Sequence, residues 1–137
     1  LLRMVPSVVV ELQVAPEGKA LNLELAHMTL SEPDSHALEE GLILKERYGG
    51  KVTALALEAP GVDRVLFAAL VKGADRAAKI VGLEAGLSTW AVAGVFAQAL
   101  SNEPGLLPAD LILTGAQGID DLDGLVAPVL AQLWPAG

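Results

Sequence analysis

The chain contains no cysteine, which excludes a disulfide framework, a thiol nucleophile and a thiolate metal site. Basic residues are also scarce, because 9 Lys and Arg stand against 17 Asp and Glu and leave a formal net charge of -8. This charge would repel a phosphate backbone, so we expect no nucleic-acid partner. Long apolar runs are missing too: residues 90–100 are interrupted by Gln98 and are too short to span a bilayer. We therefore expect a soluble, cytoplasmic protein without a membrane partner.

Aromatic residues make up only 4% of the chain, but 53% hydrophobic residues over 137 positions are enough to bury one core. We expect a single α/β domain spanning residues 1–137. The sequence begins at Leu1 without an initiator methionine and ends just after an expected helix. We therefore expect that N-terminal residues and a C-terminal extension are missing.

Strand-like and helix-like patterns alternate along the chain. Valine-rich residues, a Pro-Glu-Gly-Lys turn and a second apolar stretch predict an N-terminal β-hairpin over about residues 8–23. Ser31 and Asp34 stand at capping-box spacing around a proline, which predicts a helix start. The expected helices cover residues 33–48, 63–72, 89–100 and 121–133, and the expected strands cover 52–57, 76–81 and 110–114. The alternation predicts an α/β fold with a three-layer, Rossmann-like parallel sheet and helices on both faces.

Residues 111–123 combine an apolar run, a glycine turn and an acidic helix start. Gly115 and the small residues after it keep the turn free of bulk, so a ligand's phosphates can approach the backbone. Open α/β sheets bind ligands at the carboxyl ends of strands where the strand order reverses, and this turn has such a position. Asp120, Asp121 and Asp123 favour a helix N-terminus, and capping is the simpler interpretation. A divalent cation is less favoured, because no second cluster supplies further oxygen ligands.

Residues typical of catalysis are not arranged in a recognisable pattern. His27 and His36 have no Ser, Cys or paired carboxylate at a spacing that indicates a triad. The chain also has no glycine-rich phosphate loop with a lysine. We therefore expect no catalytic residue and no resident metal. Trp90 and Trp134 are expected to be core or interface anchors.

Three blocks occur in one order along the chain: Asp34-Ser-His-Ala-Leu-Glu-Glu-Gly-Leu-Ile-Leu-Lys-Glu46, Lys72-Gly-Ala-Asp-Arg76 and Gln117-Gly-Ile-Asp-Asp121. Together they resemble the β subunit of electron transfer flavoprotein, and the resemblance covers essentially the whole chain. It implies a domain of the adenine-nucleotide α-hydrolase type that pairs with an α-type subunit. It further implies that FAD, held mainly on that partner, carries electrons from acyl-CoA or other dehydrogenases, and that the β subunit binds a structural AMP.

The resemblance also implies a nucleotide pocket built from separate parts of the chain. Carried over position by position, its residues are Leu1, Ser31, Asp34, Leu57, Ala116, Gln117, Gly118, Ile119, Asp120, Asp121, Asp123, Gly124 and Val126.

The chain departs from the family pattern at several of these positions. Glu32 adds a carboxylate near the implied nucleotide, and Ala116 replaces the family's lysine. Leu122 replaces an aspartate, and residues 124–127 replace a run of amide and hydroxyl donors. Each lost charge-assisted hydrogen bond would cost roughly 1.5–3 kcal/mol. The helix N-terminus expected around residues 121–124 is what remains to receive an anion.

Two functions are therefore open from the sequence. The first is an electron transfer flavoprotein β-type subunit with a weakened AMP site. The second is a degenerate nucleotide-binding-fold interaction module that has lost AMP and FAD binding and self-associates as a homo-oligomer.

Overall fold

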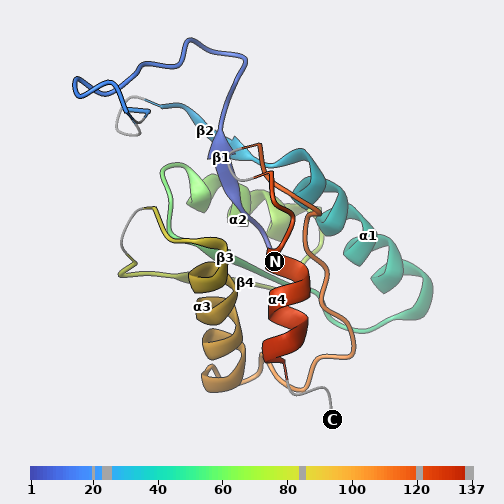
Figure 1. Ribbon diagram of the computed structural model, residues 1–137. Helices are drawn as coiled ribbons and strands as arrows, with labels where there is room; N and C mark the ends of the chain where they lie inside the picture. The colour runs from blue at the N-terminus through green and yellow to red at the C-terminus, as the bar shows by residue number, and fades with distance from the viewer. Residues whose placement is uncertain (20, 23–25, 84–85, 120–121, 135–137) are drawn as a thin grey trace.

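A computed structural model of the chain describes residues 1–19, 21–22, 26–83, 86–119 and 122–134 (Figure 1). From β2 to α3, strands and helices alternate in the described part as the sequence patterns predict. In chain order the elements are β1 (Met4–Pro6), β2 (Met28–Leu30), α1 (Glu32–Tyr48), β3 (Thr53–Leu57), α2 (Val62–Lys72), β4 (Arg76–Ile80), α3 (Thr89–Asn102) and α4 (Val126–Leu133).

A small parallel sheet lies at the centre of the molecule. β3 and β4 pair in parallel from Thr53 opposite Arg76 to Leu57 opposite Ile80. On the other side of β3, Leu2 forms a parallel bridge with Ala56, and its amide donates to the Leu55 carbonyl at 2.8 Å. The N-terminal residues therefore continue the sheet beyond β3.

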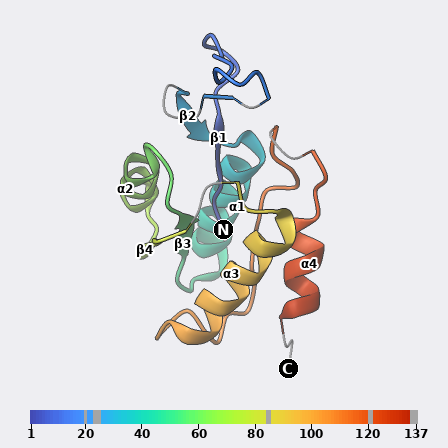
Figure 2. The same ribbon diagram turned by 60° about the vertical axis from the view of Figure 1, so that its left-hand side comes forward.

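Helices cover both faces of this sheet. Successive side chains of β3 point to opposite sides, so the strand contributes to a core on each face. Ala54 and Ala56 belong to a core cluster with the buried residues of α1 and α2. Leu55 belongs to a second cluster with the buried residues of α3 and α4. Phe96 on α3 is completely buried in that second cluster. α3 and α4 lie side by side in both ribbon views (Figures 1 and 2).

Local signals place the central elements. α1 begins after Ser31, whose hydroxyl accepts a hydrogen bond from the Asp34 amide, and it ends at Gly49. Ser88 caps α3 in the same way, and Gly73 ends α2. The predictions for α1, β3, α2, β4 and α3 are confirmed to within two residues at each end.

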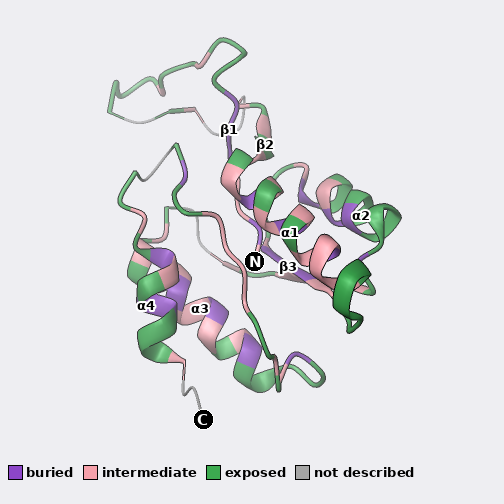
Figure 3. Ribbon diagram, turned by 90° about the vertical axis from the view of Figure 1, so that its right-hand side faces the viewer, coloured by how far each residue is buried: buried purple, intermediate pink, exposed green. Residues whose placement is uncertain are grey.

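The predicted hairpin over residues 8–23 is wrong in its boundaries. The antiparallel pair is instead formed by β1 and β2, with Met4 opposite Leu30. Within the predicted range, the described residues form only one isolated bridge, between Val14 and Leu21. Val9 is 92% exposed. Most of the described chain between β1 and β2 is drawn in green, the colour of exposed residues, in Figure 3. β-Branched residues favour a strand when a surface is there to pack on, and this segment projects away from the core.

Two further predictions near the C-terminus are also corrected. The described residues 110–114 form no strand, and the Leu113 carbonyl accepts a hydrogen bond from the Leu1 nitrogen at 2.6 Å. The helix predicted over 121–133 begins only at Val126, because Leu122 and Gly124 have φ angles of 50° and 63° that no helix accepts. Residue 121 itself lies outside the described part. Pro128 lies in the first turn of α4, where its missing N–H costs no helical hydrogen bond.

Candidate functional site

A buried polar cluster joins the start of α1 to the turn at Gly115. Ser31 and Asp34 are 3% and 2% exposed. The Ser31 hydroxyl donates to Asp34 Oδ2 at 2.6 Å, and the Gly115 amide donates to Asp34 Oδ1 at 3.0 Å. Both carboxylate oxygens of Asp34 therefore have a partner from the protein itself.

The capping box predicted from the sequence forms only in part. The Asp34 amide donates to the Ser31 hydroxyl oxygen at 3.3 Å, as a capping serine requires. The reciprocal bond is absent, because the Ser31 amide donates instead to the Arg3 carbonyl at 3.1 Å. This frees the Asp34 carboxylate to reach Gly115, 81 residues further along the chain.

Leu1 lies at the same end of the sheet. Leu1 and Leu57 pack on the core cluster of α3 and α4, to which Val126 also belongs. The structure therefore gathers these apolar residues into one core and links Asp34 to the turn that follows Leu113.

The loop after Gly115 folds back on itself. Ala116, Gln117 and Ile119 are exposed, whereas Gly118 is buried. The Leu122 amide donates to the Gly118 carbonyl at 3.1 Å. A Cβ added at Gly124 would lie 3.2 Å from the Ala116 carbonyl oxygen, so the two ends of the loop are in close contact. Asp120 and Asp121 lie outside the described residues.

Asp123 links this loop to the start of α3 and to the residue just before α4. Its Oδ2 accepts a hydrogen bond from the Thr89 hydroxyl at 2.6 Å, at the start of α3. Its Oδ1 accepts from the Leu125 amide at 2.9 Å, which is an Asx turn leading into α4. Within the range predicted to offer free N–H groups, the Leu122 amide is thus paired with Gly118, and the Asp123 carboxylate binds the Leu125 amide just before α4.

The chemistry of these residues fits the phosphate of AMP poorly. Phosphates are bound by cationic side chains and unpaired N–H groups. Residues 80–137 contain no Lys, Arg or His. Glu32 is exposed beside the cluster, and Val126 turns its apolar side chain into the core. Among the described residues, no group of three or more acidic or His side chains could hold a metal ion.

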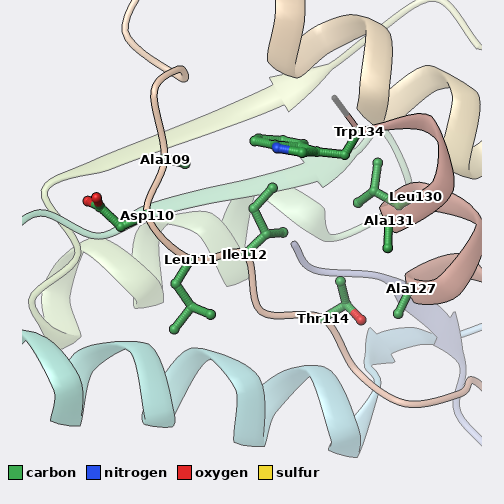
Figure 4. A pocket seen from close by; sticks show the side chains of 9 residues that line it. All are labelled: Ala109, Asp110, Leu111, Ile112, Thr114, Ala127, Leu130, Ala131 and Trp134. Carbon is green, nitrogen blue, oxygen red and sulfur yellow. The ribbon is translucent and has the colours of Figure 1, made fainter. Parts of the chain in front are cut away.

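Two hollows flank the segment that leads to Gly115. The first, about 290 Å³, lies between residues 109–114 and α4 and is mainly apolar. Figure 4 shows the Trp134 indole above Ile112, with Leu130 and Ala131 on the side of α4. The second, about 850 Å³, lies between the same segment, β3 and α1. Trp134 packs on the core cluster of α3 and α4, which agrees with its prediction as a core or interface anchor. Trp90 is 63% exposed and is therefore not a core residue of the chain.

Sequence reasoning missed two members of the site. Gly115 was expected only to keep the turn free of bulk, yet its amide is the direct partner of Asp34. Thr89 was expected only as the first residue of the helix predicted over 89–100, yet its hydroxyl donates a hydrogen bond to Asp123. A glycine directly after an apolar run is a signal for a close contact, but its partner was too distant in the chain to be found.

The fold and this site define a class of protein: an α/β domain with a pinned loop at the edge of a parallel sheet. More specifically, the chain belongs to the electron transfer flavoprotein domain family, whose model matches residues 22–137. The resemblance found in the sequence is confirmed. Within the part of the chain that the structure describes, no helix is long and apolar enough to cross a membrane.

Several curated relatives match most of the chain. The electron transfer flavoprotein subunit beta of Clostridium acetobutylicum is 30% identical over 96% of this chain and 49% of its own length. Protein FixA of Bradyrhizobium diazoefficiens is 33% identical over 89% of this chain and 43% of its own. The acryloyl-CoA reductase electron transfer subunit gamma of Anaerotignum propionicum is 31% identical over 96% and 49%. The chain thus spans about half the length of the curated relatives it matches.

Proposed function

We propose that the chain acts as a β-type subunit of an electron transfer flavoprotein and has no catalytic activity of its own. The observation that carries the proposal is the family match over residues 22–137. The relatives support it, because their names describe electron transfer subunits. The partner would be an α-type subunit that holds most of the FAD site, and the electron donor would be an acyl-CoA or other dehydrogenase.

The domain architecture supports this assignment at a finer level. Helices on both faces of a parallel sheet are consistent with a Rossmann-like domain of the adenine-nucleotide α-hydrolase type. We propose that residues 1–137 form one such domain. The pocket residues carried over from the family would then surround the loop that Asp34 and Asp123 hold in place.

Within this function, the AMP site is weak or lost. The loop offers carboxylates and apolar side chains where a phosphate requires donors, and the last basic residue of the chain is Lys79. An anion placed beside Glu32 or beside Asp123 would be repelled by the carboxylate there. We therefore expect the complex to carry flavin without a full equivalent of AMP.

The direct test is co-expression of the chain with an α-type subunit encoded beside it. The purified sample would be examined by size-exclusion chromatography, visible absorbance and mass spectrometry of the released nucleotides. A heterodimer with a reducible flavin spectrum and little AMP supports the proposal. A heterodimer with one AMP per β-type chain would overturn the weakened site but not the subunit assignment.

A second candidate is an interaction module that has kept the fold and lost both nucleotides. The donor-poor loop favours it, as do the exposed apolar residues of α2, among which Phe67 and Val71 are 68% and 89% exposed. A colourless, nucleotide-free homo-oligomer that ignores the α-type subunit would select this function over the first.

A further inference from the structure

We infer that Asp34 is a positioning residue: its buried carboxylate holds the Gly115 amide and thereby sets the place of the described parts of the loop that follows, residues 115–119 and 122–124. The inference deepens the proposed function and rests on it only in one respect, namely that this loop borders the proposed nucleotide pocket. In the family-derived site Asp34 was a residue of the pocket itself. The geometry points to a different role, in which Asp34 acts through Gly115 and contacts no ligand.

The Asp34 carboxylate is buried, and each of its oxygens is already paired within the chain. Asp34 is 2% exposed, and its two oxygens accept from the Ser31 hydroxyl and the Gly115 amide. A buried carboxylate needs such partners, because an unpaired charge in the core is strongly destabilising. Asp34 is thus satisfied entirely from within the chain.

Ser31 fixes the direction of this carboxylate. Its hydroxyl donates to Oδ2 and its oxygen accepts from the Asp34 amide, so the side chain is held at both ends of one short turn. Oδ1 is left pointing at the Gly115 amide. A helix cap alone would need only the bonds between Ser31 and Asp34, whereas the bond to Gly115 joins distant parts of the chain.

The backbone at Gly115 closely approaches Asp34. A Cβ on Gly115 would lie 2.8 Å from the Asp34 amide nitrogen, Cγ and Oδ2. Gly115 is not among the glycines with positive φ, so its backbone conformation is open to any residue. The glycine is required here by the contact with Asp34. Two contacts hold the following described residues in place relative to Gly115. They are the hydrogen bond from the Leu122 amide to the Gly118 carbonyl and the close approach of Gly124 to Ala116.

The experiment measures amide hydrogen exchange in the full chain, resolved at Gly115 by NMR. In Asp34→Ala, exchange at Gly115 should rise about tenfold or more, because its acceptor is lost, while amides of β3 stay within about threefold of wild type. Asp34→Asn should restore most of the protection at Gly115, since its carbonyl oxygen can still accept. The matched control is Asp110→Asn, an exposed carboxylate on the same segment, which should leave Gly115 unchanged.

Two results would overturn the inference. One is unchanged exchange at Gly115 in Asp34→Ala. The other is an equal rise throughout the chain, which would make Asp34 a general stabilising residue without a local positioning role. If Asp34→Ala does not fold, Asp34→Asn and Ser31→Ala decide: the inference requires near-normal protection of Gly115 in the first and faster exchange in the second.

A separate readout keeps this inference distinct from the proposed function. The flavin absorbance of the co-expressed complex would be compared for wild type and Asp34→Ala. A complex without flavin in the wild type would refute the proposed function, whereas the exchange data on the chain alone would still decide the role of Asp34. A flavin-containing wild type whose absorbance falls in Asp34→Ala, with recovery in Asp34→Asn, supports both.

Discussion

The contact between Gly115 and Asp34 makes a sharp prediction for Gly115→Ala. The added methyl group would lie 2.8 Å from backbone and side-chain atoms of Asp34, which real Cβ atoms essentially never do. The Asp34 amide belongs to the first turn of α1 and cannot retreat without disturbing that helix. The turn at residue 115 must therefore move away, and the hydrogen bond to Asp34 Oδ1 must lengthen or break.

The magnitude follows from two overlapping effects. Overpacking a well-filled site costs about 1–3 kcal/mol. Leaving a buried acceptor such as Asp34 Oδ1 without its partner costs about 1–3 kcal/mol. Because one displacement relieves the clash while it breaks the bond, the two costs do not add in full. We expect Gly115→Ala to lower the free energy of unfolding by about 2–4 kcal/mol.

The assay is urea unfolding followed by far-UV circular dichroism, with the midpoint and the slope fitted separately. The expected result is a lower midpoint with an unchanged slope, which marks a change in stability and not in the surface exposed on unfolding. Gly94→Ala is the matched control, because Gly94 lies within α3 and an added Cβ meets nothing within 4 Å. It should stabilise the chain by about 0.5–1 kcal/mol through helix propensity alone.

One outcome would refute the reasoning directly. If Gly115→Ala unfolds at the wild-type midpoint, the close approach of the two backbones is not a feature of the folded chain. The assignment of Asp34 as a positioning residue would then lose its geometric basis.

Three further substitutions test other parts of the structure. Phe96→Ala should cost about 3–5 kcal/mol in urea unfolding because the ring is fully buried, whereas Phe67→Ala at an exposed site should stay within about 0.5 kcal/mol. The Lys45 ammonium and the Val52 amide lower the pKa of Asp75 below its ordinary 3.8, so the stability advantage of wild type over Asp75→Asn should be present at neutral pH and shrink as pH falls through the lowered value. Thr89→Val should speed exchange of the Leu125 amide, because Asp123 loses its second partner.

Each of these has a clear contrary result. Equal losses for the two phenylalanine variants would mean that the core cluster of α3 and α4 is not packed as described. An advantage over Asp75→Asn that grows on acidification would place the pKa shift in the wrong direction. Unchanged exchange at Leu125 would show that the loop is held without Thr89.

Local patterns predicted most of the framework correctly because they act over a few residues. A serine cap, a following proline and a closing glycine placed α1, and strand-like apolar runs between such signals placed β3 and β4. The valine-rich residues 8–14 show where this reasoning fails. Their strand preference depends on a surface to pack against, and no such surface is present where this segment projects.

The candidate site was predicted less completely for a related reason. The sequence identified Asp34 and the loop after Leu113 as parts of one site, but it could not show which atoms meet. The helix predicted from Asp121 also failed, because the positive φ angles of Leu122 and Gly124 interrupt it. Of the acidic residues predicted at the start of this helix, the structure describes Asp123. Its carboxylate closes a turn before α4 and does not leave a free helix N-terminus.

The sequence by itself determined the family, the alternation of helices and strands, and the scarcity of positive charge after Lys79. These depend on residue identity and short-range spacing, which are fully present in the unfolded chain. Only the tertiary structure decided that Asp34 is saturated by Ser31 and Gly115, and that Gly115 must lack a side chain. Hydrogen bonds and steric exclusion act over a few ångströms, so residues 81 positions apart acquire these roles only when folding brings them into contact.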